Sequence, residues 1–221
     1  LVVSPLIALM HDQVAGLRAR GVEAAYIDST LSRREVDQRW TNAEYGQYDV
    51  LYVAPERLAS DVFLARAERF DVSLLAVDEA HCVSEWGHHF RPAYLDIPDA
   101  RALLGDPPTI AVTATATPAV RRDIATLLQL RDPVCVVRGF DRPNVVWSVF
   151  RTENKRAKVA DVLGAVEGSG IVYAATRRGV EEWVRVLEEA GETAVGYHGG
   201  MTAEARAAAQ RRWIEGEARL V

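Results

Sequence analysis

The chain has 221 residues, 49% of them hydrophobic and 26% charged, a composition that excludes a disordered polypeptide. Its formal net charge of −5 argues against a broad basic surface, so any contact with nucleic acid must be local. Two cysteines, Cys82 and Cys135, provide neither a disulfide framework nor a metal-ligand cluster, which fits a reducing cytoplasm. No apolar run is long enough to span a membrane, so we expect no membrane partner.

The first half of the chain alternates short apolar runs with amphipathic segments. Residues 1–3 predict a strand, and a Ser-Pro turn leads from it into a helix with one apolar face, formed by Met10, Val14 and Leu17. A short strand is expected over 24–27. A capping box of Ser and Glu opens the helix predicted over 32–45. Residues 49–58 repeat the pattern of an apolar run that ends in a turn.

The central stretch, residues 74–94, reads LLAVDEAHCVSEWGHHFRPAY. Its unbroken apolar start, residues 74–77, predicts a strand buried on both faces of a parallel sheet, where ligands bind beyond the carboxyl ends of the strands. The adjacent carboxylates of Asp78 and Glu79 follow at that end. One can hold the magnesium that neutralises a nucleotide triphosphate, while the other orients or deprotonates the attacking water. A solvated acidic pair is an equally good interpretation of these four residues alone.

Aromatic rings follow the carboxylates. Trp86, Phe90 and Tyr94 are interleaved with two histidines and Arg91, so they offer base-stacking surfaces and phosphate donors beside the hydrolytic pair. Alternatively, the rings are core aromatics. The glycine and proline within this segment favour a loop over a packed helix face.

Strand and helix alternate through the rest of the chain, which predicts an α/β fold. Residues 109–112 predict one more buried strand, and Thr117 with the following proline predicts the start of a helix that ends near Leu128. In the second half, we expect three helices. The first begins at about residue 155, the second carries Val180, Val184 and Leu187 on one apolar face, and the third covers about 202–214. Strands are expected at 170–173 and 194–197.

The segment VDEAHCVSEWGHHFRPAY resembles motif II and the adjoining aromatic-rich loop of the RecQ-family DNA helicases of superfamily 2. DEAH alone also fits RNA helicases, but the Trp-Gly-His and Phe-Arg-Pro that follow point to RecQ. Further segments resemble motifs Ia (SPLIALMHDQV), Ib (DVLYVAPERL) and III (TAT), the interlobe segment FDRPN, and the first motifs of the second lobe (GIVYAATRRGVEEW and GYHGGM). His89 stands where the family usually has Asp, which leaves the pairing of Arg91 open, and Ala174 stands where Cys is more frequent.

The resemblance implies a helicase that uses ATP and Mg²⁺, translocates 3′ to 5′ on single-stranded DNA and unwinds duplexes in DNA repair and recombination. It would be cytoplasmic, and nucleoid-associated if bacterial. Asp78 would hold magnesium through water, Glu79 would act as base or orienter, and His81 would relay nucleotide state with Thr113 and Thr115. The implied DNA contacts are Trp86, His88, Phe90, Arg91, Ser4, Gln13, Arg57, Thr176 and Arg177. For Arg57, a surface salt bridge to a carboxylate is an equal alternative.

The resemblance also divides the chain. It implies that residues 1–140 form a first RecA-like lobe without its phosphate-binding part, that 141–150 form a linker, and that 151–221 begin a second RecA-like lobe. No G-x-x-x-x-G-K-[ST] segment occurs in the sequence; in the family it lies upstream of Leu1, and later arginines lie beyond Val221. We therefore expect an internal fragment of a longer protein that alone neither hydrolyses ATP at a useful rate nor unwinds DNA.

Two other functions remain open from the residues. One is a nucleic-acid binding or annealing module without ATPase activity. The other is a metallohydrolase that uses the oxygen and imidazole ligands of Asp78, Glu79, His81, His88 and His89. No H-E-x-x-H or comparable helix spacing supports the metallohydrolase.

Overall fold

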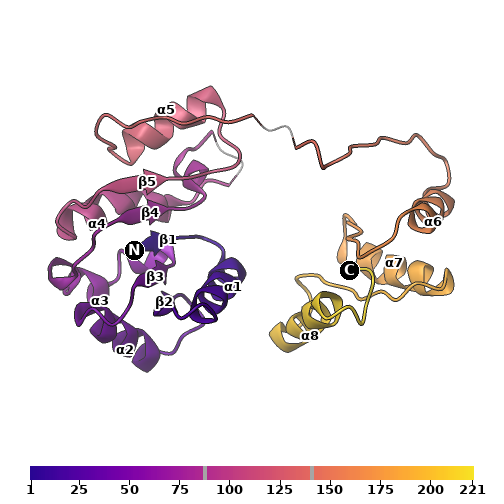
Figure 1. Cartoon of the computed structure of the whole chain (residues 1–221), viewed down its shortest axis with the longest axis horizontal. Helices are drawn as coiled ribbons and strands as arrows, with labels where there is room; N and C mark the ends of the chain where they lie inside the picture. Colours follow the sequence, from indigo (N-terminus) through magenta and orange to yellow (C-terminus); the bar gives the residue numbers. More distant parts are fainter. Residues whose placement is uncertain (87–88, 140–141) are drawn as a thin grey trace. The chain divides into compact units, whose positions relative to one another are not determined.

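The computed structural model describes residues 1–86, 89–139 and 142–221. Its internal contacts divide the chain into two units, Leu1–Arg138 and Gly139–Val221. We describe each unit by itself (Figure 1).

The first unit is built on a parallel sheet of five strands in the order β2-β3-β1-β4-β5. The strands are β1 (Val2–Val3), β2 (Ala24–Ile27), β3 (Val50–Val53), β4 (Leu75–Val77) and β5 (Thr109–Ala111). Its helices are α1 (Ile7–Arg18), α2 (Arg33–Glu44), α3 (Asp61–Leu64), α4 (Ile97–Leu103) and α5 (Pro118–Leu127). The α/β fold predicted from the sequence is therefore confirmed.

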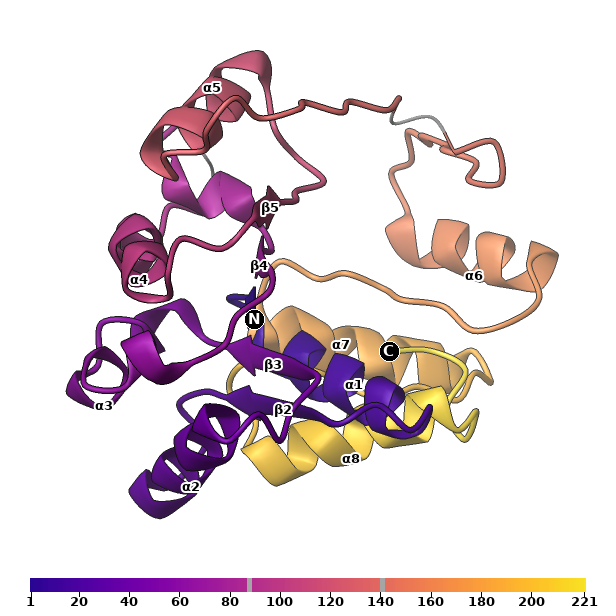
Figure 2. The ribbon, with the colours of Figure 1, turned by 60° about the vertical axis from the view of Figure 1, so that its left-hand side comes forward.

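Helices α2, α3 and α4 lie on one face of the sheet, and α1 lies on the other (Figures 1 and 2). The strand order explains this arrangement, because the chain moves away from β1 to reach β2 and then moves back across the sheet through β3 and β4 to β5. Right-handed crossovers made in opposite directions place their helices on opposite faces. The main core lies on the α2 side, where Val3, Val53 and Val77 pack with Trp40 and Phe63.

The two last strands of the first unit are not buried on both faces, contrary to the expectation from their apolar character. In β4, Leu75 and Val77 are buried but Ala76 between them is only half-buried, and in β5 Ile110 is 49% exposed. The reason is the position of α1, which packs against β2 at the opposite end of the sheet. The alternation of buried and half-buried residues along β4 thus shows that only one face of this strand is covered.

Local signals in the sequence set the helix ends. The Ser32 hydroxyl accepts from the backbone N–H of Glu35 at 3.3 Å, and the Glu35 carboxylate accepts from the Ser32 N–H at 2.8 Å, which completes the predicted capping box. Thr117 caps α5 by accepting from the Val120 N–H at 3.3 Å. Val120, Ile124 and Leu128 are buried, whereas Leu127 at the last helical position is 38% exposed.

The second unit contains α6 (Lys155–Ala165), α7 (Arg177–Glu189) and α8 (Ala203–Ile214), as predicted. The strands expected at 170–173 and 194–197 are reduced to single parallel bridges, from Gly170 and Ala194 to Leu220. They are short because both segments pair with the same three residues, 219–221, through backbone hydrogen bonds. Within the described residues, no helix combines the length and apolar character needed to cross a bilayer.

Candidate active site

The carboxylate of Asp78 is held at the carboxyl end of β4 by two donors. Its Oδ1 accepts from the backbone N–H of Glu79 at 2.9 Å, and its Oδ2 accepts from the Ser4 hydroxyl at 3.0 Å. The Asp78 backbone N–H in turn donates to the carbonyl of Val3, on the neighbouring strand β1. A carboxylate offers about four acceptor positions, so two remain for a cation or its water shell.

Glu79 has a left-handed backbone, with φ 47° and ψ 42°. Non-glycine residues adopt this conformation at a cost, and it often marks a functional site. Here it begins the 3₁₀ helix η3 (Ala80–Val83), in which the Cys82 N–H donates to the Glu79 carbonyl at 2.9 Å. Its side-chain Oε2 lies 3.2 Å from Nδ1 of His81.

His81 contacts both the predicted hydrolytic residue Glu79 and the predicted relay threonines. It is 8% exposed, and its Nδ1 lies 2.8 Å from the Thr113 hydroxyl and 3.5 Å from the Thr115 hydroxyl. The Thr113 oxygen also accepts from the Thr115 N–H at 3.2 Å. Which partner receives the ring proton depends on the tautomer. The structure thus brings together Glu79, His81 and both threonines, from two different segments of the chain.

Tyr94 belongs to the core and not to the exposed aromatic set. Its ring is fully buried, and its hydroxyl donates to the backbone carbonyl of Asp78 at 2.8 Å. Burial, with the nearby Cys82 and Asp78, raises the pKa of Tyr94 well above its usual value, so the hydroxyl remains a donor at neutral pH. The core alternative is therefore correct for this ring.

Trp86 is the opposite case, with 84% of its surface exposed. Phe90 is half-buried, and the Arg91 N–H donates to the Cys82 carbonyl at 2.9 Å, which closes the base of the aromatic-rich loop, described over residues 84–86 and 89–91. The Arg91 guanidinium lies 3.7 Å from the Glu56 carboxylate, so the arginine has an acidic partner although position 89 is a histidine. His88, a predicted DNA contact, lies outside the described residues.

Sequence reasoning missed a hydrogen-bonded pair next to this site. The Ser84 hydroxyl donates to the carboxylate of Asp123 at 2.6 Å and accepts from the Trp86 N–H at 3.3 Å. They lie 39 residues apart in the chain, and although Ser84 falls within the RecQ-like segment, nothing in the sequence pairs it with Asp123, so only the folded chain brings them together.

Residues 1–124 match the model of the DEAD/DEAH box helicase family. The chain belongs to this family. Over its whole length it is 40% identical to the ATP-dependent DNA helicase RecQ of Bacillus subtilis, of which it covers 38%. It is 38% identical to the probable ATP-dependent DNA helicase RecS of the same organism, with 98% of the chain and 44% of that relative covered. The resemblance to RecQ helicases is thereby confirmed, and the chain spans less than half the length of these relatives.

Solved helicase structures share the fold. The Mycobacterium smegmatis helicase Lhr bound to single-stranded DNA and AMP-PNP aligns with 100% of the chain and 33% of its own length, at a TM-score of 0.64 and 22% identity. The helicase MrfA bound to DNA and AMPPNP aligns with 100% of the chain and 34% of its own length, at a TM-score of 0.71 and 18% identity. At these identities the likeness shows the fold alone.

The remaining DNA contacts predicted for the first unit lie in different environments. Ser4 is 1% exposed and bonds Asp78, so we assign it to the carboxylate site and correct its prediction as a DNA contact. Gln13 is exposed, with its amide oxygen accepting from the Tyr52 hydroxyl at 3.1 Å. Arg57 donates from Nη2 to the backbone carbonyl of Asp28 at 2.7 Å, and not to a carboxylate as the salt-bridge alternative required.

Asp28 forms a second polar centre that sequence reasoning missed. Its fully buried carboxylate lies 2.7 Å from Nε2 of His11 and accepts from both the N–H and the hydroxyl of Thr30. Burial alone would raise the pKa of Asp28, but the hydrogen bonds from Thr30 and His11 outweigh it and lower the pKa. The carboxylate is therefore ionised at neutral pH.

In the second unit, the predicted contacts Thr176 and Arg177 lie at the start of α7. The Thr176 hydroxyl caps the helix by accepting from the Gly179 N–H at 3.0 Å. Arg177 passes over Gly200, where a Cβ atom would lie 3.0 Å from Arg177 Cδ. A glycine at this position of GYHGGM thus leaves room for the arginine.

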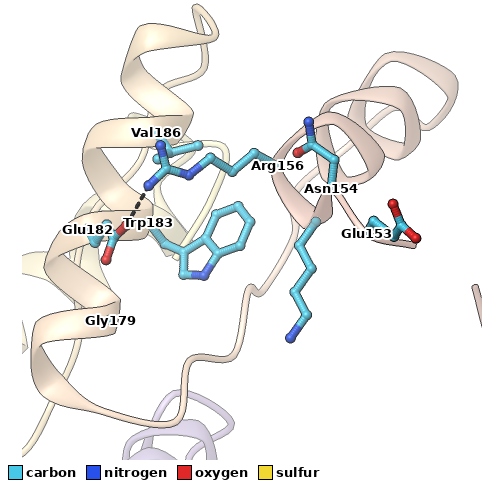
Figure 3. A pocket seen from close by; sticks show the side chains of 8 residues that line it. Glu153, Asn154, Arg156, Gly179, Glu182, Trp183 and Val186 are labelled. Atoms are coloured by element: carbon cyan, nitrogen blue, oxygen red, sulfur yellow. Dashed lines mark hydrogen bonds and ion pairs between the residues drawn. The ribbon is translucent and has the colours of Figure 1, made fainter. Parts of the chain in front are cut away.

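A hollow of about 400 Å³ lies between the start of α6 and the first turns of α7. Figure 3 shows Arg156 reaching from α6 to its ion-pair partner Glu182 on α7, beside the ring of Trp183. None of the predicted site residues lines it. A larger hollow of about 900 Å³ follows residues 168–176 and includes Thr176.

The metallohydrolase alternative finds no support among residues 1–86, 89–139 and 142–221. Within these ranges, no three His, Cys, Asp or Glu side chains come together in a way that could hold a metal ion. His88, one of the ligands considered, falls outside them.

Proposed function

We propose that the intact protein is an ATP-dependent DNA helicase of the RecQ type, which translocates 3′ to 5′ on single-stranded DNA and unwinds duplexes in repair and recombination, in the cytoplasm or nucleoid. The observation that carries this proposal is the position of His81, whose Nδ1 lies 3.2 Å from Glu79 and 2.8 Å from Thr113. This contact connects the hydrolytic carboxylate with the segment that leads into α5.

Asp78 and Glu79 divide the hydrolytic roles. Asp78 would hold Mg²⁺ through its water shell, since its oxygens are hard ligands and retain acceptor positions beyond the bonds to Ser4 and Glu79. The ion would neutralise the phosphates of ATP. Glu79 then orients or deprotonates the attacking water, and the contact with His81 sets the direction of its carboxylate.

DNA is gripped by the aromatic-rich loop. The 84% exposed ring of Trp86 provides a stacking surface, and each stacked base contributes about 1–3 kcal/mol. Phe90 and Arg91 lie at the far end of the same loop, next to the backbone bond that closes it. Movement of Thr113 and Thr115 relative to His81 would report nucleotide state to this loop.

The 221 residues alone are proposed to be inactive. They contain no G-x-x-x-x-G-K-[ST] cradle for the phosphates, and a missing arginine finger costs about 10³–10⁵ in rate in related phosphoryl transfer. DNA-stimulated ATP turnover by this chain alone would contradict this part of the proposal.

The decisive variant is Glu79→Gln in the intact protein. Because only the hydrolytic carboxylate is altered, we expect ATP turnover to be abolished while DNA affinity, measured by fluorescence anisotropy, stays within about twofold of the parent. Glu68→Gln, at an exposed acid of the same unit outside this site, serves as a matched control and should retain turnover. If the parent binds DNA but shows no ATP turnover, the protein is a binding or annealing module and the proposal is wrong.

Trp86→Ala tests the loop separately. Since the ring is exposed and outside the carboxylate site, DNA-independent ATP turnover should stay near the parent value while stimulation by single-stranded DNA falls. Stimulation equal to that of the parent would exclude the loop from coupling.

A further inference from the structure

Ser84 stands at the entrance of the aromatic-rich loop, and its side chain is completely buried. Its hydroxyl donates to Asp123 Oδ2 at 2.6 Å and accepts from the N–H of Trp86 at 3.3 Å. Hydrogen bonds from a hydroxyl to an ionised carboxylate are short and stronger than neutral ones. The backbone that carries the exposed Trp86 ring is therefore bonded, through one hydroxyl, to a carboxylate on α5.

Helix α5 is in turn joined to η3 at a second place. The segment before α5 contains Thr113, whose hydroxyl lies 2.8 Å from His81 in η3. Val120 and Ile124 of α5 are buried in the same core cluster as Val83 of η3, so the two elements also pack directly. One bond thus lies at His81, beside the carboxylate of Glu79, and the other lies at Ser84, where the aromatic-rich loop begins.

We infer that Asp123 is a positioning residue which, through Ser84, fixes the aromatic-rich loop to α5 and transmits the nucleotide-dependent position of the Thr113–Thr117 segment to Trp86. This inference rests on the proposed function. Asp123 touches neither ATP nor DNA in this role. It is the single acidic residue of α5 and follows two arginines, yet its Oδ2 bonds the buried hydroxyl of Ser84.

Loss of this bond has a specific consequence. A buried hydroxyl that loses its carboxylate partner must find another partner or remain unpaired, so the start of the loop is expected to shift. The packing of α5 by Val120 and Ile124 remains. The carboxylate site should therefore stay intact while its connection to the Trp86 ring is weakened.

The test compares Ser84→Ala, Asp123→Ala and the double variant in the intact protein. We expect each single change to lower the stimulation of ATP turnover by single-stranded DNA by about fivefold or more, with DNA-independent turnover within about twofold of the parent. The double variant should resemble either single variant, because both changes remove the same bond. Asp123→Asn keeps an acceptor oxygen and should recover part of the stimulation. Asp99→Asn, at an exposed acid of α4, is the matched control and should behave as the parent.

Two outcomes overturn the inference. Effects of the single changes that multiply in the double variant would show that Ser84 and Asp123 act separately. A parallel loss of DNA-independent and DNA-stimulated turnover would show that Asp123 merely supports the fold of the site.

Hydrogen exchange separates this inference from the proposed function. In the DNA-free protein, Asp123→Ala should accelerate exchange of the Trp86 amide, whose acceptor Ser84 is no longer held. If the parent shows no DNA-stimulated turnover, the proposed function fails, and hydrogen exchange alone then tests whether the bond between Ser84 and Asp123 holds the start of the loop. An unchanged exchange rate at the Trp86 amide would show that this bond does not hold the loop.

Discussion

At the scale of single residues, Glu79 combines a strained backbone with the proposed catalytic role. Its φ of 47° costs a non-glycine residue about 1–2 kcal/mol. The bonds that hold it come from both sides, since its N–H donates to Asp78 and its carbonyl accepts from Cys82. This conformation turns the chain directly after β4 and allows Glu79 and His81, two positions apart, to meet.

Replacement of Ser4 tests whether this buried hydroxyl serves the carboxylate or DNA. In the intact protein, Ser4→Ala removes one of the two donors to Asp78, and we expect turnover to fall by about 10-fold, as for other residues that orient a metal-binding group. DNA affinity should be unchanged, because Ser4 is 1% exposed. Gln13→Ala, an exposed change on the following helix, should show the reverse pattern in the same two assays. A loss of DNA affinity in Ser4→Ala would restore the DNA-contact interpretation.

Asp28 should make stability depend on pH in the acidic range. Its pKa is lowered in the folded chain, so the unfolded chain binds more protons as the pH falls. Its contribution is therefore complete above the unfolded pKa of about 4 and is lost as the pH falls through the folded pKa. We expect Asp28→Asn to lower the free energy of unfolding by about 1–3 kcal/mol at pH 7, with the difference shrinking at about pH 3. Urea unfolding at both pH values measures this.

The matched control for Asp28 is Asp12, an exposed acid on the same helix as His11. Asp12→Asn should change the free energy of unfolding by about 0.5 kcal/mol or less at either pH. A pH-independent deficit in Asp28→Asn would mean that the carboxylate charge is not what stabilises this centre.

At the scale of elements, α5 is defined by a strong local signal and by its contact with η3. Thr117 with Pro118 determines where the helix begins, and the buried side chains of Val120 and Ile124 hold it in the core of the first unit. The helix follows the threonines that contact His81 by only a few residues. A change in the first turn of α5 therefore tests what the helix cap contributes to the free energy of unfolding.

Thr117→Ala removes the cap of α5 and leaves the N–H of Val120 without its side-chain acceptor. We expect a loss of about 1 kcal/mol in the free energy of unfolding, measured by urea denaturation. Thr126→Ala, at an exposed position near the end of the same helix, should be neutral or slightly stabilising. Equal losses in both variants would indicate that helix propensity, and not the cap, is responsible.

At the scale of the whole molecule, the two units have unequal cores. Among the described residues, the first unit buries one large cluster that includes Trp40, Phe63 and Tyr94, whereas the second buries two clusters of three residues each. The chain between them, described over 131–139 and 142–150, is exposed throughout, with Trp147 at 89%. Little buried apolar surface holds this stretch in place.

Limited trypsin digestion of the 221-residue chain should cut this stretch first. Arg138, at the end of the first unit, and Arg151 are exposed and flank residues 139–150, so the early product is expected to be the first unit, identified by mass spectrometry. Arg142 is not an expected site, because Pro143 follows it and trypsin does not cleave an Arg-Pro bond. Arg101, 7% exposed and paired with Asp106, should resist cleavage at the same protease concentration. Early cuts inside the first unit would contradict this division of stability.

Individual elements show which parts of the fold the sequence patterns predicted and which they did not. The capping box at Ser32 was predictable because it depends on residues within one turn, and the strand predicted at Ala24–Ile27 forms because β3 pairs with all four of its residues. The strands expected at 170–173 and 194–197 are reduced to single bridges, because a strand exists only where a partner pairs with it, and here residues 219–221 serve both. Trp86 and Tyr94 looked alike in the sequence, yet one is exposed and the other is fully buried.

The sequence by itself determined the α/β alternation, the helix starts, the likeness to RecQ helicases and the adjacency of Asp78 to Glu79, since all of these depend on neighbours along the chain. Only the tertiary structure decided that Ser4 bonds Asp78, that Thr113 meets His81 and that Asp123 holds Ser84. These pairs are separated by 74, 32 and 39 residues. Their contact depends on strand order and on which face each helix covers, and neither is encoded in a local pattern.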